Sequence, residues 1–284
     1  MNNEEIVLKV LNIMHEVKKI LENKNIEIEQ KEGNSNFVTD MDKKIENYLK
    51  KSILEIFPNV QFIAEESENE IIENENIKLK FVIDPIDGTT NFTNDWPYAT
   101  AIGIVNDNQL IGGIIYEILE DTVYLGIKNK GVYKTSIYDI SKLEKVKTPI
   151  YDRSDIERAV ICYDIPYGNE AFEDTLKVCS KLYYSGASLK TVGPISLDIL
   201  KMALGKENRP KDYNLATWHL EVRAWDLAAV TCILRELGGE IIGKDGKPLS
   251  IETLTNPTEK ITFIASGNEN LRNSIFDKYK EVIK

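Results

Sequence analysis

An apolar run that ends in two closely spaced carboxylates constrains the fold of this chain more than any other feature. Residues 79–83 form a short run rich in β-branched and aromatic side chains, which is typical of a buried strand. Asp84 follows directly, Pro85 interrupts the regular strand, and Asp87 stands three positions after the first carboxylate. Gly88 then removes a side chain, so the backbone can approach a ligand closely. The sequence therefore predicts a strand that delivers acidic groups to one end of a sheet.

Apolar periodicity predicts the remaining elements. Residues 4–21 and 39–57 repeat apolar side chains every three to four positions, as amphipathic helices do. Residues 60–64 predict a second short strand, which delivers Glu65. Residues 98–133 are rich in Ile, Val, Tyr and Gly with turn signals between the runs, which favours an antiparallel meander. Further along we expect strands at 159–163, 183–192 and 261–265, and helices at 170–181, 195–204, 225–237 and 268–282. The alternation of strands and helices indicates an α/β (α+β) protein.

Composition excludes several classes of protein and of site. The formal net charge of -11 argues against a general nucleic-acid surface, which needs clustered Lys and Arg. No stretch has the unbroken apolar length of a membrane span, so we expect a cytoplasmic protein with no membrane or nucleic-acid partner. The 3 cysteines show no zinc-like spacing, and the 2 histidines, His15 and His219, leave little room for a histidine-based triad or zinc site. If the chain is a hydrolase, carboxylates must perform the chemistry.

The acidic residues at the ends of the predicted elements indicate a magnesium site. Glu65, Asp84 and Asp87 follow predicted strands, and Asp226 opens a predicted helix. Two carboxylates ~5 Å apart repel by roughly 3 kcal/mol at an effective dielectric of ~20, so converging acids require a cation. Mg²⁺ prefers oxygen ligands and often binds through a few carboxylates and a substrate phosphate. Each residue alone also has a plainer interpretation, namely an Asp-Gly turn, a solvated acidic pair or a helix N-terminal charge.

Four segments together resemble a known family. Residues 84–92, Asp-Pro-Ile-Asp-Gly-Thr-Thr-Asn-Phe, look like the first signature of the inositol monophosphatase family, and residues 225–229, Trp-Asp-Leu-Ala-Ala, look like the second. Residues 37–42 and 64–67 resemble two further family segments, in the same order. The resemblance covers nearly the whole chain, and it implies a layered αβαβα sandwich, a Mg²⁺-dependent phosphomonoesterase, inhibition by Li⁺ and a homodimer.

The resemblance also implies roles for individual residues. One Mg²⁺ would be bound by Glu65, Asp84 and the Ile86 carbonyl, and a second by Asp84, Asp87 and Asp226. A third, weaker ion can sit near Glu65 in this family.

Other implied roles concern the phosphate and the attacking water. The N–H groups of Gly88 and Thr89 would hold the phosphate, Asp87 would lie beside it, and Thr89 and Glu65 would orient the water. Lys31 aligns with a lysine of a mobile metal-site loop, although a solvated surface lysine is an equal alternative.

We expect residues 1–147 to form an N-terminal α+β subdomain with most of the metal ligands. The polar residues 135–147 mark the boundary, and residues 148–284 would form a C-terminal α/β subdomain with Asp226 and the substrate rim.

The rim departs from the family pattern. Residues 193–196, Gly-Pro-Ile-Ser, take the place of a Gly-Thr/Ser-Ala-Ala-like turn that precedes a helix in the family. Pro194 changes the shape of this turn and removes an N–H. The family's inositol-binding glutamate falls on His219, which suits a rim or structural role, and Glu221 could replace it only if the strand register differs. Arg223 could meet a second phosphate or a carboxylate, or form an ordinary surface ion pair. The chain is also longer than the family pattern before Trp225, around residues 206–211.

Because both signatures are intact, the resemblance implies hydrolysis of a small sugar or polyol phosphate monoester, with inositol 1-phosphate as the first candidate. Fructose-1,6-bisphosphatase, histidinol-phosphatase and nucleotide 3′-phosphatase activities are alternatives within the same chemistry. A non-catalytic binding or regulatory module on the same fold is an alternative of another class.

Overall fold

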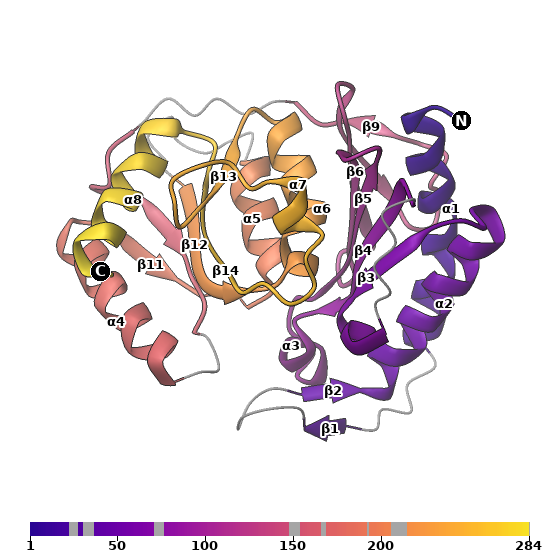
Figure 1. Cartoon of the computed structure of the whole chain (residues 1–284), viewed down its shortest axis with the longest axis horizontal. Helices are drawn as coiled ribbons and strands as arrows, with labels where there is room; N and C mark the ends of the chain where they lie inside the picture. Colours follow the sequence, from indigo (N-terminus) through magenta and orange to yellow (C-terminus); the bar gives the residue numbers. More distant parts are fainter. Residues whose placement is uncertain are drawn as a thin grey trace.

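The chain folds around two large sheets (Figure 1). The computed structural model describes residues 1–22, 28–30, 37–70, 77–147, 154–165, 169–191, 193–205 and 215–283. The helices are α1 (Asn3–Glu22), α2 (Asp40–Ile56), α3 (Thr89–Thr93), α4 (Asn169–Tyr184), α5 (Ile195–Leu204), α6 (Ala224–Glu236), α7 (Ile251–Leu254) and α8 (Glu269–Val282), with a 3₁₀ helix η1 (Glu65–Glu70). Among the described residues, no helix combines the length and the apolar composition that a membrane crossing requires.

The first sheet contains the predicted meander. Its strands follow one another in chain order: β3 (Gln61–Ala64), β4 (Leu79–Asp87), β5 (Ala99–Asn106), β6 (Gln109–Glu117), β7 (Thr122–Ile127), β8 (Gly131–Ser136) and β9 (Glu144–Lys145). Among the described strands of this sheet, β3 and β4 pair in parallel and all the other neighbours pair antiparallel. Parallel pairing places the carboxyl ends of these two strands at the same end of the sheet, so Glu65 and Asp84 emerge together.

The second sheet is mixed. Its spatial order is β11 (Ser188–Lys190), β10 (Val160–Cys162), β12 (Leu215–Val222), β14 (Ile261–Ser266) and β13 (Glu240–Gly243). A small separate pair is formed by β1 (Ile28–Gln30) and β2 (Phe37–Thr39).

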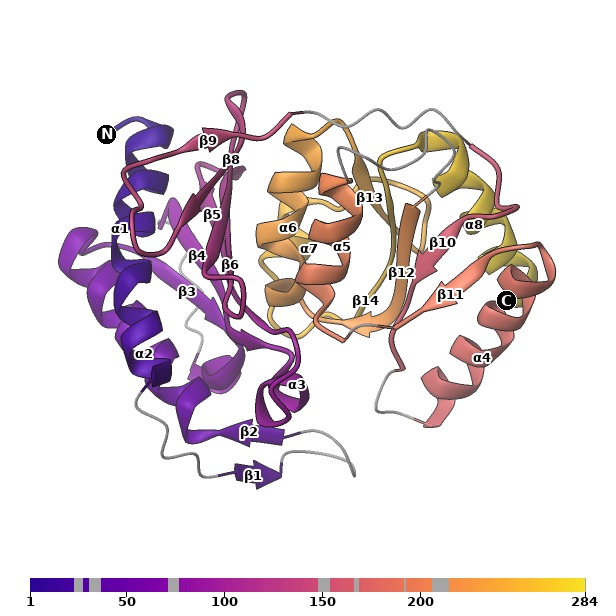
Figure 2. The ribbon, with the colours of Figure 1, turned by 180° about the vertical axis from the view of Figure 1, so that it is seen from behind.

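Helices and sheets alternate in five layers. α1 and α2 cover the outer face of the seven-stranded sheet, α5 and α6 lie between the two sheets, and α4 and α8 cover the outer face of the five-stranded sheet (Figures 1 and 2). Three large apolar cores fill the spaces between these layers: one under α1 and α2, one around α5 and α6 between the sheets, and one under α4 and α8. They are represented by Ile45, Leu227 and Trp218, respectively. This arrangement confirms the predicted αβαβα sandwich.

Two parts of the second half differ from the sequence prediction. The predicted strand at 183–192 is wrong in its first part, because α4 continues to Tyr184 and β11 begins only at Ser188. Tyr184 is 86% exposed, so an aromatic residue that suggested a strand is the solvated end of a helix, and Gly186 reverses the chain at φ +93°. The strands β12 and β13 and the short helix α7 were not among the predicted elements. Residues 148–153 lie outside the described part, so the subdomain boundary after residue 147 stays a prediction.

Candidate active site

The end of β4 turns both of its aspartates to the same side. Side chains three positions apart on a regular strand face opposite ways. The pairing of β4 with β5 shifts register between Asp84 and Asp87, and the intervening Pro85 has no N–H to pair. Thr100 donates a 2.8 Å hydrogen bond to the Pro85 carbonyl, which fixes the irregular segment. The bulge therefore brings two carboxylates together that a regular strand would separate.

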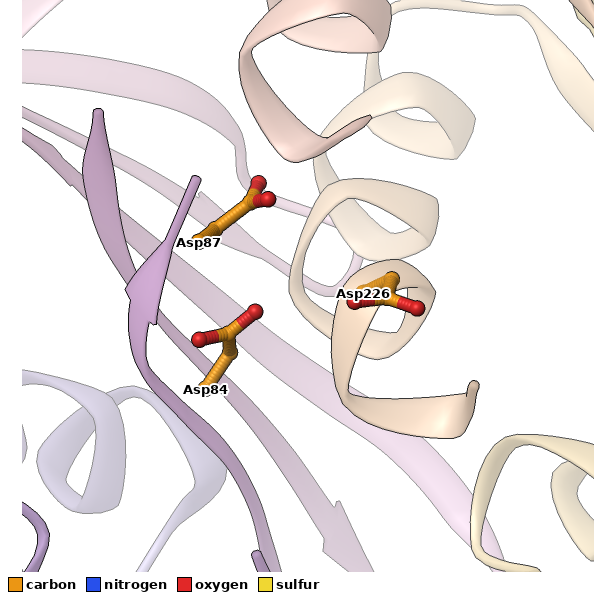
Figure 3. Close-up of side chains that lie close together, drawn as sticks. All are labelled: Asp84, Asp87 and Asp226. Carbon is orange, nitrogen blue, oxygen red and sulfur yellow. The ribbon is translucent and has the colours of Figure 1, made fainter. Parts of the chain in front are cut away.

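α6 brings a third carboxylate to this pair. A Cβ at Gly103 would lie 2.5 Å from Cβ of Ala228, and one at Gly113 would lie 2.0 Å from the Ala229 carbonyl oxygen. The absence of side chains on the sheet thus allows α6 to approach its backbone closely. Asp226, in the first turn of α6, faces Asp84 and Asp87 across the gap (Figure 3).

The three aspartates form a compact group. One carboxylate oxygen from each of Asp84, Asp87 and Asp226 can be chosen so that all lie within 4.8 Å of one another. Oδ2 of Asp226 accepts the Arg223 N–H at 2.6 Å, which sets the direction of its carboxylate at the start of the helix. Among the described residues, Oδ1 of Asp84 is buried without a hydrogen-bond partner.

Burial and mutual repulsion raise the pKa of each of these carboxyls. The pKa of Asp84 lies well above its usual range, mainly because the group is buried and further because Glu65, Asp87 and Asp226 repel its charge. Burial and repulsion by Asp87 likewise raise the pKa of Asp226. Burial raises the pKa of Asp87 to about 6, less far because hydrogen bonds from Ser196 and Ile195 oppose the shift.

Glu65 and Ile86 lie beside this group. Glu65 follows β3 at the start of η1, is partly buried and repels the charge of Asp84. Ile86 is 1% exposed, and its carbonyl oxygen lies 3.4 Å from the hydroxyl oxygen of Thr89. The structure therefore brings together the residues that the sequence assigned to metal binding, with Glu65 outside the tight three-membered group.

Asp42 is a site residue that the sequence analysis missed. The Thr89 hydroxyl donates to Oδ1 of Asp42 at 3.2 Å, and Asp42 is fully buried on α2. Asp42 ends the family-like segment 37–42, so that segment could have indicated it.

Gly88, just before α3, and Gly193, just before α5, each lie against a residue of the other segment. Gly88 has φ +92°, and a Cβ there would lie 2.7 Å from Cγ of Pro194. Gly193 has φ +121°, with the Asn91 side chain at 2.8 Å from a Cβ built there. Pro194 itself lacks an N–H, but the next two residues donate theirs to Asp87. The unusual turn thus still delivers backbone donors to the site.

His219, one of the predicted rim residues, makes its described contacts within the second sheet. His219 is 2% exposed, its ring stacks on Phe263 with centroids 5.2 Å apart, and burial lowers its pKa to about 3. Its placement favours the structural role over the rim role, and contact with a substrate stays a prediction.

Glu221 and Arg223 both have protein partners. The register of β12 against β14 shifts between His219 and Val222, which is the irregularity that Glu221 would need to reach a substrate. Glu221 has φ +59°, and its carboxylate accepts a 2.9 Å hydrogen bond from Lys260. Nη1 of Arg223 donates to the Thr258 carbonyl at 2.6 Å. The roles of Glu221 and Arg223 at a substrate stay predictions. Lys31 and residues 206–211, which the sequence analysis also singled out, lie outside the described residues.

The acidic group fits a hard divalent cation. All of its side-chain donors are carboxylate oxygens, which Mg²⁺ prefers. The pKa values of Asp84 and Asp226 are raised by burial and mutual repulsion, and a bound cation would offset both effects. The unpartnered oxygen of Asp84 leaves a donor atom for such an ion.

Comparison with known proteins gives a consistent result. The model of the inositol monophosphatase family matches residues 2–281. The chain is 28% identical to "Fructose-1,6-bisphosphatase/inositol-1-monophosphatase" of Aquifex aeolicus over 90% of this chain and 87% of the relative. It is 26% identical to "Inositol-1-monophosphatase" of Bacillus subtilis over 90% of this chain and 88% of the relative.

A solved structure shares the fold. The "IMPase/NADP phosphatase complexed with Mg2+ and phosphate" superimposes with a TM-score of 0.77 at 19% identity, covering 98% of this chain and 96% of the other.

Proposed function

The chain belongs to the inositol monophosphatase family, whose members are metal-dependent phosphatases, and we propose that it hydrolyses a small polyol or sugar monophosphate with Mg²⁺. Inositol 1-phosphate is the first candidate substrate. The observation that carries the proposal is the group of Asp84, Asp87 and Asp226, whose carboxylate oxygens lie within 4.8 Å of one another. Four segments of the family signature accompany this group in the sequence.

The proposed ligands of Mg²⁺ are all oxygen donors. They are the carboxylates of Glu65, Asp84, Asp87 and Asp226 and the carbonyl of Ile86. When bound at such a site, Mg²⁺ lowers the pKa of water and offsets negative charge on the leaving oxygen. The relative that binds Mg²⁺ and phosphate on the same fold supports this choice of ion. We propose two ions, with a third, weaker one near Glu65.

The residues of the chain itself bind phosphate and orient water. The Gly88 and Thr89 N–H groups stand at the beginning of α3, where backbone donors suit phosphate oxygens, and Gly88 leaves them accessible. The Thr89 hydroxyl, with Asp42 at 3.2 Å, orients the attacking water together with Glu65. Asp87, a proposed metal ligand, also accepts the N–H groups of Ile195 and Ser196 at the start of α5, and we assign it a place beside the bound phosphate.

The leaving alcohol is the open part of the proposal. The relatives carry the names of inositol-1-monophosphatase, fructose-1,6-bisphosphatase and NADP phosphatase, so this fold accommodates several alcohols. Gly193, His219, Glu221 and Arg223 stay the candidates for the rim that selects among them.

Phosphate release from a substrate panel tests the proposal. The panel contains inositol 1-phosphate, fructose 1,6-bisphosphate, histidinol phosphate and a nucleotide 3′-phosphate, each with and without Mg²⁺. Asp87→Asn should abolish turnover, whereas Asp245→Asn, at an exposed site, should retain it. No turnover with any substrate would favour a non-catalytic binding module, and full activity in Asp87→Asn would refute the assigned site.

The family resemblance also supports a homodimer and inhibition by Li⁺. Light scattering at two protein concentrations tests the first, and a Li⁺ titration of the turnover rate tests the second.

A further inference from the structure

A buried glutamate on α2 binds the segment that carries Glu65. Glu46 is 3% exposed, and its Oε2 accepts the backbone N–H of Glu66 at 2.8 Å. Its Oε1 accepts the Ser67 hydroxyl at 2.5 Å. A buried carboxylate is costly unless hydrogen bonds or a cation compensate it, and Lys50, one helical turn later, lies 3.6 Å from Oε1.

These contacts act where the chain leaves β3. The Glu66 N–H belongs to the peptide bond that joins Glu65 to Glu66, so the hydrogen bond orients the backbone of Glu65. Ser67 departs from helical geometry, with φ -123° and ψ 32°, and forms the kink in η1. Lys50 donates a further 2.8 Å hydrogen bond to the Ser67 hydroxyl. The backbone that follows Glu65 is therefore held by a network centred on Glu46.

The same helix holds the other residue that we assign to the water. Asp42 precedes Glu46 by one helical turn, so both carboxylates lie on one face of α2, and Asp42 accepts the Thr89 hydroxyl. Buried apolar residues, including Ile45 and Leu49, anchor this helix to the first sheet. One helix thus contacts both Thr89 and the segment that follows Glu65.

We propose that Glu46 is a positioning residue, which acts on metal binding only through Glu65. This inference rests on the proposed function, because it requires Glu65 to be a metal ligand. The described polar contacts of Glu46 are with Glu66, Ser67 and Lys50, to none of which we assign a part in the reaction. A merely structural glutamate would affect stability and leave the affinity for metal unchanged.

A double-mutant cycle on metal affinity tests the inference. The probe is Mn²⁺ alone, which accepts the same oxygen ligands as Mg²⁺, and the free ion is followed by electron paramagnetic resonance. The variants are Glu46→Ala, Glu65→Gln and the double substitution, and Glu55→Ala on the exposed side of α2 is the matched control. Each titration is performed about 15 °C below the melting midpoint of the variant, so that every variant is folded while its affinity is measured.

The effect of Glu46→Ala on the Mn²⁺ Kd should depend on whether Glu65 is present. Loss of an outer-shell partner typically weakens metal binding by 10 to 100 times, so Glu46→Ala should raise the Mn²⁺ Kd about tenfold in the wild-type background. In the Glu65→Gln background the same change should alter Kd by less than about twofold. Glu46→Gln keeps one carbonyl acceptor and should show a smaller effect than Glu46→Ala. Ser67→Ala, which removes one hydrogen bond to Glu46, replaces Glu46→Ala in the cycle if that variant does not fold.

Four outcomes would overturn the inference. A tenfold effect in both backgrounds would show that Glu46 acts independently of Glu65, and an unchanged Kd with a lower melting midpoint would show a structural role only. An unchanged Kd in Glu65→Gln would show that Glu65 is no ligand. If the wild-type chain does not bind Mn²⁺, the proposed function fails as well. If it binds Mn²⁺ and Glu46→Ala has the same effect in both backgrounds, only the inference about Glu46 fails.

Discussion

The Ser196 N–H donates a 2.7 Å hydrogen bond to Oδ2 of Asp87, which joins β4 of the first sheet to the first turn of α5. The Ile195 N–H donates to Oδ1 of the same carboxylate at 3.1 Å. A helix N-terminus favours negative charge, and these donors limit the rise in the pKa of Asp87 to about 6. Asp87 therefore connects the two halves of the site and, without metal, is the acid of the group most easily ionised.

Replacement of Gly88 should disturb this junction. Gly88→Ala would combine the strain of φ +92° with a contact of 2.7 Å to Pro194, so we expect the free energy of unfolding to fall by about 3 kcal/mol. Gly238→Ala is the matched control, because Gly238 has φ +86° but no atom within 4 Å of a Cβ built there. The control should lose only about 1 kcal/mol. Equal losses in urea denaturation would contradict the role of the Pro194 contact.

The Thr89 hydroxyl should matter for turnover and little for metal binding. Thr89→Ala removes the group that Asp42 holds at 3.2 Å, and we expect kcat to fall about 100-fold. Thr89→Ser retains the hydroxyl and should recover most of the rate. Thr93→Ala, at the other end of α3, is the control. A Thr89→Ala enzyme with normal kcat, or one whose loss comes from weaker Mn²⁺ binding, would argue against an orienting role.

The sequence predicted which elements deliver the acidic residues. β3, β4 and α6 all appear near their predicted positions, because apolar runs and helical periodicity are local signals. The convergence of Asp84 with Asp87 was harder to predict from the sequence, because it requires a bulge that depends on the partner strand. The signature around Pro85 indicated an irregular segment without giving its direction.

Buried charges were the least predictable part of the site. Asp42 and Glu46 belong to a helix rich in charged residues, and charges on an amphipathic helix usually face solvent. Their burial depends on Thr89 and on the η1 backbone, which are distant in sequence. The family resemblance likewise placed His219 at a rim position, whereas its ring stacks on Phe263 in the structure.

The metal-free protein should lose stability as the pH rises. Asp198 on α5 is 2% exposed, and burial, with repulsion by Asp87 and Asp164, raises its pKa to about 8. The folded chain therefore keeps a proton that the unfolded chain releases near pH 4, so the free energy of unfolding falls between about pH 4 and pH 8. Asp198→Asn should remove this dependence on pH, and the stability of the variant relative to wild type should rise by about 3 kcal/mol from pH 5 to pH 7.5. A difference that does not change with pH, in denaturation with EDTA present, would contradict this origin.

Mg²⁺ should stabilise the fold, because it would neutralise carboxyls whose pKa values are raised by burial and mutual repulsion. At 100 times Kd a ligand adds about 2.7 kcal/mol, which for a chain of this size corresponds to a rise of about 5 °C in the melting midpoint. Binding releases protons from Asp84 and Asp226, so the rise should be larger at pH 8 than at pH 6. Asp226→Asn should lose most of it, and NaCl at equal ionic strength, which only screens charge, should not reproduce it. An unchanged midpoint at saturating Mg²⁺, or an equal rise in NaCl, would contradict metal binding by the three aspartates.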